Sequence, residues 1–142
     1  MSRHTLREKL FLLLFRTEFH EKEDMDGQIA HFFEEFAKER GMDSSEDPSA
    51  AELKERYDDL TRHLPEIDKK LDERISGWTT NRIGKVELTI LRIAVYEMDH
   101  DELISDAIAI NEAVELAKKY GQEKSGEFIN GVLAKFADGT RE

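Results

Sequence analysis

The fold of this chain is decided by one stretch, residues 107–136, which reads AIAINEAVELAKKYGQEKSGEFINGVLAKF. Its second half contains the pair Asn130-Gly131, which is typical of tight turns because both residues tolerate a positive φ. Apolar side chains on both sides of the pair, from Ile129 to Leu133, nevertheless recur at helical spacing. We therefore interpret the stretch as two amphipathic helices, with Asn130-Gly131 inside the second helix.

The same helical periodicity runs through the rest of the chain. Helices are predicted over about residues 3–20, 25–39, 48–63, 84–100 and 105–120, with another starting at Pro65 and the last running from Ser125 to near Ala137. No strand alternation persists anywhere in the sequence. We therefore predict an all-α fold, a bundle of about seven helices.

Several helix ends carry recognisable signals. Gly41 is expected to stop the second helix, and Asp47 is the N-cap predicted in front of Pro48. A capping box from Ser49 to Glu52 is the alternative start for that third helix. Ser125 is the cap predicted for the last helix, and that role is sufficient to explain it.

Length and composition indicate one soluble globular domain. The chain has 142 residues, of which 39% are apolar and 37% are charged, and it has no cysteine. Disulfides and thiolate metal sites are therefore excluded, which fits a reducing cytoplasm. The apolar run from Leu10 to Phe15 is far shorter than the roughly 18 residues of a membrane span. It also lacks a small-residue cleavage site, so we expect no signal peptide and a cytoplasmic location.

The charge of the chain is negative but unevenly distributed. The net charge is −11, from 21 basic and 32 acidic residues, which argues against a large phosphate-binding surface. The acidic excess lies largely in residues 21–59, whereas residues 1–20 are basic. A second basic cluster consists of Lys118, Lys119 and Lys124. This pattern predicts a small, local anion site, with a solvated helix face as the alternative.

No catalytic, cofactor or metal site is predicted. Glu97 and His100 have the Glu-x-x-His spacing of di-iron bundles, but such a site needs a second copy of the motif and two further carboxylates. We interpret the pair as the end of a helix. The segment from Gly121 to Gly126 has the spacing of a phosphate-binding loop, yet Glu127 and Phe128 stand where that loop needs Lys and Ser or Thr. The resulting prediction is that the protein is not an enzyme.

Binding of nucleic acid has better support in the sequence. Arg3 and Arg7 are four residues apart, so they share one helix face and can hold phosphates through bidentate guanidinium contacts. Single-stranded RNA is also held by stacking on aromatic rings. Phe128 supplies such a ring if it lies at the rim of the protein, and a buried core position is the alternative.

Three stretches together resemble the NusB family. They are REKLFLLLF at residues 7–15, WTTNRIGKVELTILRIAVYEM at residues 78–98, and the opening stretch with its Ile-Asn-Glu-Ala and Ser-x-x-Phe-Ile-Asn-Gly-Val-Leu motifs. The resemblance covers essentially the whole chain and is weaker over residues 21–65. It implies an all-α fold in which two small helical bundles pack across each other, here as a single domain over residues 1–142.

The resemblance also implies a function. NusB proteins are bacterial antitermination factors that pair with NusE, a protein of the small ribosomal subunit, and bind the boxA element of nascent ribosomal RNA. This binding helps the RNA polymerase antitermination complex to pass terminators. By motif position, the expected RNA contacts are Arg3, Arg7, Lys118, Lys119 and Phe128. Glu87 fills the acidic position that is expected to meet NusE.

Other motif residues are expected to be mainly structural. They are Trp78, Leu91, Arg92, Tyr96, Asn111, Glu112 and Asn130. We further predict that Gly131 lets another helix approach its backbone, and that Asn130 bonds to buried backbone there. Such packing would offset the helix-propensity cost of glycine, about 1 kcal/mol.

The sequence departs from the family pattern at positions that bear on RNA. The usual Gln and Tyr of the first helix are Leu12 and Phe15, the N-terminus has fewer arginines, and a commonly acidic position is Lys124. The departures in the first helix favour an alternative, a protein-interaction module in which RNA binding is weakened or lost, whereas Lys124 adds positive charge near the expected RNA surface. The fold also occurs as the RNA-binding domain of ribosomal RNA methyltransferases, but no glycine-rich cofactor domain is recognised here. Because the family includes monomers and homodimers, the oligomeric state stays open.

Overall fold

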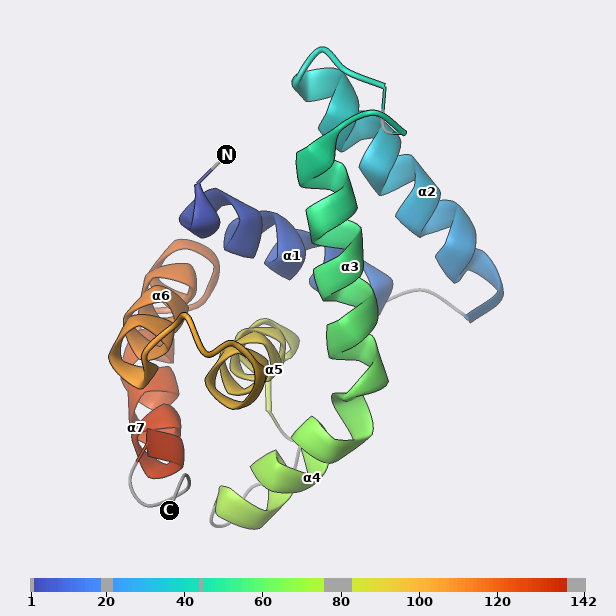
Figure 1. Cartoon of the computed structure of the whole chain (residues 1–142). Coiled ribbons are helices and arrows are strands. Elements are labelled where there is room, and N and C mark those ends of the chain that lie inside the picture. The colour runs from blue at the N-terminus through green and yellow to red at the C-terminus, as the bar shows by residue number, and fades with distance from the viewer. Residues whose placement is uncertain (1, 19–21, 44, 76–82, 138–142) are drawn as a thin grey trace. The chain divides into compact units, whose positions relative to one another are not determined.

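Every helix expected from the periodicity is present. The computed structural model describes residues 2–18, 22–43, 45–75 and 83–137, and these contain helices but no strand. The helices are α1 (Arg3–Glu18), α2 (Lys22–Glu39), α3 (Pro48–Arg62), α4 (Leu64–Arg74), α5 (Lys85–His100), α6 (Asp106–Tyr120) and α7 (Ser125–Ala137), as Figure 1 shows. The predicted all-α class is confirmed.

The chain divides into two compact units. The N-terminal unit consists of residues 1–61 and the C-terminal unit of residues 62–142. The first holds α1, α2 and α3 up to its last residue, and the second holds α4 to α7. Each unit is built from its own buried apolar side chains.

The N-terminal unit is organised by α1. Its leucines Leu6, Leu10, Leu13 and Leu14 are buried, at the spacing that places them along one side of a helix. α1 packs against α2, and the hydroxyl of Tyr57 on α3 donates a hydrogen bond of 3.2 Å to the hydroxyl of Thr17. The predicted apolar run is therefore the buried part of the first helix.

The connection between α2 and α3 follows the sequence signals. Gly41 adopts a φ of 71°, the left-handed conformation that ends a helix and that glycine adopts at little cost. Oδ1 of Asp47 accepts a hydrogen bond of 2.9 Å from the backbone N–H of Ser49, so Asp47 is the N-cap and the alternative capping box is not used. The other oxygen, Oδ2, pairs with Nε of Arg40 at 2.8 Å.

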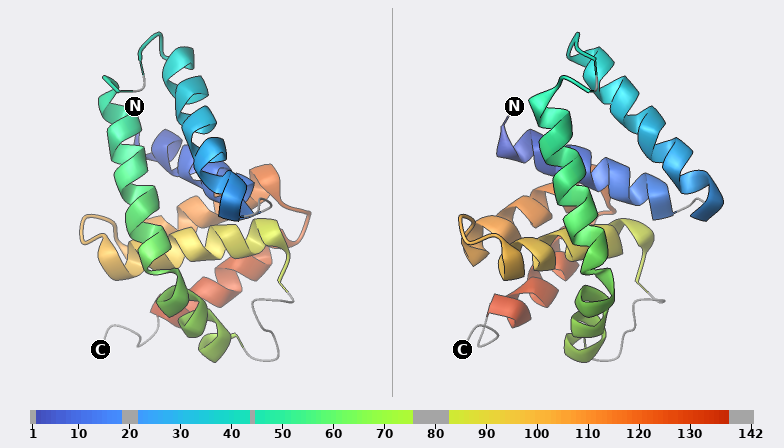
Figure 2. Two further views of the ribbon diagram at one scale, coloured as in Figure 1. Left: turned by 90° about the vertical axis from the view of Figure 1, so that its right-hand side faces the viewer. Right: turned by 45° about the vertical axis from the view of Figure 1, so that its right-hand side comes forward.

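The C-terminal unit is built around α5. Every residue of α5 from Leu88 to Met98 is buried, which explains why its sequence is apolar nearly all round. α6 and α7 are joined by a short loop, pack together and both contact α5, while α4 contacts α5 and α7 (Figures 1 and 2). Arg92 forms a bidentate ion pair with Asp68 of α4, with both nitrogen–oxygen distances at 2.9 Å. The structural roles predicted for Leu91, Arg92 and Tyr96 agree with their burial.

The packing role predicted for Gly131 is wrong. Asn130 and Gly131 do lie inside α7, but both are exposed, and a Cβ added at Gly131 would meet nothing within 4 Å. Close approach occurs at Gly121 instead, where an added Cβ would lie 2.7 Å from the carbonyl oxygen of Ala117. Asn111 is exposed as well, so its predicted structural role and that of Asn130 are not supported by burial.

The structural role predicted for Trp78 cannot be compared with the structure, because this residue lies outside the described residues. The helix predicted to start at Pro65 is α4, which ends at Arg74 with the buried Ile75 as its C-cap. None of the helices in the described part of the chain is long and apolar enough to cross a membrane.

Candidate functional site

Glu87 and Phe128 line the same hollow, although sequence reasoning assigned them to different partners. This hollow, which we call the Phe128 hollow, has a volume of about 380 Å³ and lies where α5 and α7 begin. Its other lining residues are Ile83, Gly84, Gln122, Lys124 and Ser125. A residue expected at the RNA and a residue expected at NusE are therefore neighbours on one surface.

A short hydrogen-bond chain fixes the floor of the Phe128 hollow. The hydroxyl of Ser125 donates to Oε1 of Glu87 at 2.9 Å and accepts from the backbone N–H of Gln122 at 2.8 Å. Ser125 is the first residue of α7 and is buried, so the prediction that it caps this helix is wrong. Its hydroxyl instead ties the α6–α7 loop and the start of α7 to α5.

Glu87 is held by a second feature of the chain. A Cβ added at Gly84 would lie 2.9 Å from Oε2 of Glu87, so the absence of a side chain at Gly84 leaves room for the carboxylate. Glu87 is half-buried in the first turn of α5. The carboxylate is therefore positioned before any partner binds, which lowers the entropy cost of a contact with a cation or an N–H group.

Phe128 occupies the rim position that stacking requires. Its side chain is half-buried and lines the Phe128 hollow, whereas its neighbour Ile129 is fully buried. The core alternative for Phe128 is therefore wrong. A half-exposed ring beside Lys124 combines an aromatic face with a nearby positive charge, and this combination suits a nucleotide.

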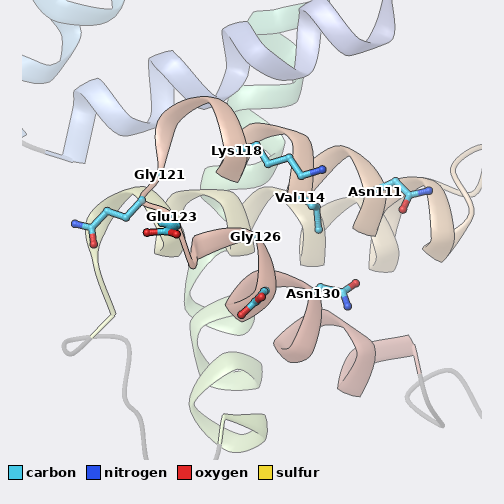
Figure 3. A pocket seen from close by; sticks show the side chains of 9 residues that line it. Asn111, Val114, Lys118, Gly121, Glu123, Gly126 and Asn130 are labelled. Atoms are coloured by element: carbon cyan, nitrogen blue, oxygen red, sulfur yellow. The ribbon is translucent and has the colours of Figure 1, made fainter.

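A second hollow, the α6–α7 groove, adjoins the first. It has a volume of about 530 Å³, and Gln122 lines both hollows. Figure 3 shows Asn111, Val114 and Lys118 projecting from α6 and Asn130 from α7. Each asparagine amide both donates and accepts hydrogen bonds, as do the edges of nucleic-acid bases.

The lysines near the groove are accessible. Lys118 is exposed and its Nζ lies 3.6 Å from a carboxylate oxygen of Glu115, an exposed pair that is worth little. Lys119 is exposed, with its Nζ 5.4 Å from the centre of the Tyr120 ring. A phosphate can therefore recruit Lys118 without breaking a strong contact.

Carboxylates limit the positive charge of the groove. Glu123 and Glu127 are exposed residues that also line the α6–α7 groove. The groove is thus of mixed charge rather than a continuous basic patch.

Arg3 and Arg7 belong to the N-terminal unit and are not equally accessible. Arg3 is exposed, whereas only 7% of Arg7 is exposed. The hydroxyl of Ser2 accepts a hydrogen bond of 3.1 Å from the backbone N–H of Thr5, and the first turn of α1 has no acidic residue. The positive end of the helix dipole therefore reinforces Arg3 as an anion contact.

The two unusual residues of α1 take part in packing. Leu12 and Phe15 are half-buried, and the Phe15 ring is stacked on that of Phe11 with the ring centres 5.7 Å apart. They supply apolar contacts at the two positions where the resemblance led us to expect Gln and Tyr. Of the two, only Phe15 has a ring on which an RNA base could stack.

Sequence reasoning missed several residues of the two hollows. The link between Ser125 and Glu87 spans 38 positions, so no local pattern reveals it. Asn111 and Asn130 are polar residues within otherwise apolar motifs. This polarity could have indicated a surface position, but we interpreted it as a buried structural role. Ile83 and Gly84 precede α5 and had no evident role.

Comparison with known proteins finds relatives of this chain in one family. A family model described as the NusB family matches residues 4–138. The transcription antitermination protein NusB of Agathobacter rectalis is 43% identical over 137 residues, covering 96% of this chain and all of that protein. The NusB of Lachnoclostridium phytofermentans is 42% identical over 138 residues, covering 97% of this chain and all of that protein.

Solved structures agree with the sequence comparison. NusB of T. maritima is similar with a TM-score of 0.82 and 28% identity, covering 98% of this chain and 92% of that one. A crystal structure of the antitermination factors NusB and NusE in complex with dsRNA contains a chain with a TM-score of 0.70 and 29% identity, covering 96% and 98% of the two chains. With an all-α fold, a family match over nearly its whole length and relatives above 40% identity, this chain belongs to the NusB family.

Proposed function

We propose that this chain is a transcription antitermination factor that pairs with NusE and binds boxA-type RNA of nascent ribosomal RNA in the bacterial cytoplasm. The family membership and the relatives named as antitermination proteins support this role. The related NusB–NusE complex with RNA supports both classes of partner. The proposed action is binding alone, without a catalytic step.

The observation that carries the RNA part of the proposal is the arrangement of the two adjoining hollows. The half-exposed ring of Phe128 and the ammonium groups of Lys118 and Lys124 lie around them, with two asparagine amides in the groove. Stacking, phosphate neutralisation and base-edge hydrogen bonding are the three contacts that hold a single RNA strand. Lys119 is assigned a supporting role because it is exposed one residue after Lys118.

The arginines of α1 have unequal roles in this proposal. Arg3 is the phosphate contact, since it is exposed beside the positive end of α1. Arg7, which is almost fully buried, reaches RNA only if its side chain rearranges. With a net charge of −11, RNA affinity of the free protein should be weak and strongly salt-dependent.

Glu87 is the residue proposed to meet NusE. Its carboxylate is fixed by Ser125 and Gly84, so it can accept a hydrogen bond or pair with a basic side chain without first being ordered. Because Glu87 and Phe128 share one hollow, NusE bound at Glu87 would lie beside RNA bound at Phe128. This arrangement predicts that NusE and RNA bind cooperatively.

A protein-interaction module without RNA binding is the second candidate. Leu12 and Phe15 favour it because they replace hydrogen-bonding groups on α1, and the burial of Arg7 removes a second expected phosphate contact. In this case NusE would bind through Glu87, and the affinity for boxA RNA would be no higher than for an unrelated RNA.

A titration separates the two candidates. A fluorescent boxA-like RNA would be titrated with the protein, with and without NusE, at two salt concentrations. Lys118→Ala/Lys119→Ala and Phe128→Ala are the test variants, and Lys69→Ala, which removes an exposed lysine of α4, is the matched control. Antitermination predicts that NusE tightens binding, and that Phe128→Ala weakens it by about 1–3 kcal/mol, the usual worth of base stacking. RNA binding that is absent with NusE bound would support the interaction module.

A further inference from the structure

Two histidines from different helices face each other in the C-terminal unit. His63 is the N-cap residue of α4, and His100 is the last residue of α5. Their ring centres are only 4.1 Å apart, and the rings are tilted by 41°. The His63 side chain makes no capping hydrogen bond to α4.

A carboxylate completes this group. Glu66 lies in the first turn of α4, three residues after His63, so both project from one side of the helix start. One ligand atom from each of His63, Glu66 and His100 can be chosen such that all three lie within 4.8 Å of one another. Glu66 and His100 are exposed and His63 is half-buried, so the group is open to solvent on one side.

Two ion pairs near the histidines hold α4 and α5 close together. Nζ of Lys70 pairs with Oδ2 of Asp99 at 2.7 Å, and Arg92 pairs with Asp68 at 2.9 Å. Both pairs cross from α4 to α5. Lys70 lies farther from Glu66, at 3.5 Å, so its closer partner is Asp99, and a metal ion at Glu66 would compete only with the weaker, more exposed pair.

The ring of Tyr96 limits the freedom of both histidines. Its centre lies 5.3 Å from that of His100 and 6.3 Å from that of His63, and Tyr96 is buried. Aromatic contacts at these distances restrict the orientation of each imidazole. The histidines are therefore positioned before a ligand arrives.

We propose that His63, Glu66 and His100 form a binding site for a divalent transition-metal ion, with Zn²⁺ as the fitting ion. Two imidazoles and one carboxylate are a ligand set that zinc uses with water in the fourth position. Tetrahedral bonds of about 2.1 Å would place the ligand atoms about 3.4 Å apart, so small rotations of exposed side chains close the site. The hard, oxygen-preferring ions Mg²⁺ and Ca²⁺ would be poorly served by imidazole.

The site would connect α4 to α5. Because His63 and Glu66 come from α4 and His100 comes from α5, a bound ion adds a cross-link between the two helices. An ion that binds the folded chain and not the unfolded one raises the stability of the fold in proportion to the logarithm of its concentration. From the sequence we considered Glu97 and His100 as metal ligands and predicted no metal site; Glu97 is buried and does not belong to the group, whereas His100 does.

The test is calorimetric titration of the full chain with ZnCl₂ after chelator treatment, with any histidine tag removed. The result expected is one saturable Zn²⁺ site per chain. His100→Ala and Glu66→Gln should each weaken it by about tenfold or more, since each removes one ligand. His31→Ala, which removes an exposed histidine of α2, is the matched control and should bind like the parent.

A second readout reports the coordination geometry of the bound ion. Co²⁺ in the same site should give the visible absorption bands of four-coordinate cobalt, which Zn²⁺ should abolish. The proposal is overturned if the parent shows no saturable Zn²⁺ site, or if His100→Ala and Glu66→Gln bind as the parent does. It is also overturned if His31→Ala weakens binding equally. Circular dichroism confirms that each variant is folded, and should His100→Ala fail that check, Glu66→Gln decides alone because Glu66 is an exposed residue.

Discussion

The hydroxyl of Ser125, the first residue of α7, donates a hydrogen bond of 2.9 Å to Oε1 of Glu87 in the first turn of α5. The same hydroxyl accepts from the backbone N–H of Gln122 at 2.8 Å. One buried side chain thus joins the start of two helices and the loop between α6 and α7. The Phe128 hollow depends on this junction, because Glu87, Gln122 and Ser125 all line it.

Replacing Ser125 with Ala should destabilise the protein by about 1 kcal/mol, because the variant loses two partly buried hydrogen bonds. Glu87 is half-buried and Gln122 is exposed, so water can partly replace the lost hydroxyl. Thermal denaturation followed by circular dichroism measures the change. Ser45→Ala, at an exposed loop position, is the control and should change stability by less than about 0.5 kcal/mol. Equal melting temperatures for the two variants would refute the role given to the junction.

Gly131→Ala and Gly121→Ala should have opposite effects. An added Cβ at Gly131 meets nothing within 4 Å, so alanine should stabilise α7 by about 0.5–1 kcal/mol through helix propensity. At Gly121 the Cβ would lie 2.7 Å from the Cβ of Ser125 and from a backbone oxygen, so alanine should destabilise by about 1–3 kcal/mol. Chemical denaturation of both variants tests this contrast. A destabilising Gly131→Ala would restore the packing role that the sequence suggested.

The ion pair between Arg92 and Asp68 should contribute measurably to the C-terminal unit. The side chain of Arg92 is 10% exposed and that of Asp68 is 28% exposed, so the pair is partly shielded from water. Asp68→Ala should cost about 2 kcal/mol, between the values for exposed and buried pairs. Asp58→Ala breaks an exposed pair with Lys54 and should cost about 0.5 kcal/mol or less. Equal urea midpoints for the two variants would contradict this ranking.

Acid should remove the stabilising effect of Asp47. Burial raises the pKa of this carboxyl, but hydrogen bonds from Arg40 and from the backbone N–H of Ser49 outweigh burial and hold the pKa below its ordinary value of 3.8. A lowered pKa in the folded state adds stability above the ordinary value, and this stability is lost as the pH falls through the lowered pKa.

Asp47→Asn should therefore melt at a lower temperature than the parent at pH 7, and the difference should shrink as the pH falls below about 4. Melting curves over a pH series measure it. Arg40→Gln removes the partner cation and should show the same convergence with the parent in acid. A melting difference that stays constant down to the lowest pH would mean that the charge of Asp47 is irrelevant.

Helices could be predicted from this sequence because their signals are local. The apolar stripe of α1, the left-handed Gly41 and the cap at Asp47 are each set by residues within a few positions of one another. The all-round apolar sequence of α5 likewise predicted its burial. The placement of Asn130-Gly131 inside α7 followed from the periodicity around the pair.

Contacts between helices could not be predicted, because they depend on which faces meet. Ser125 was assigned to capping since a serine at a helix start usually caps, yet its hydroxyl bonds to Glu87, 38 positions away. Arg7 shares a helix face with Arg3 but is nearly buried, and periodicity alone does not reveal that difference. His63 and Glu66 were not recognised as partners of His100 because they lie at the start of α4 and His100 ends α5, so only the packing of the two helices brings them together.

The central claim, that this chain binds boxA-type RNA together with NusE, is tested most directly by the fluorescence titration in the presence of NusE. The account predicts that NusE tightens RNA binding, that higher salt weakens it, and that Phe128→Ala reduces affinity by about 1–3 kcal/mol while Lys69→Ala does not. A chain that binds NusE but leaves the RNA signal unchanged at low salt would contradict the account, and the Phe128 hollow would then be a protein-binding surface alone.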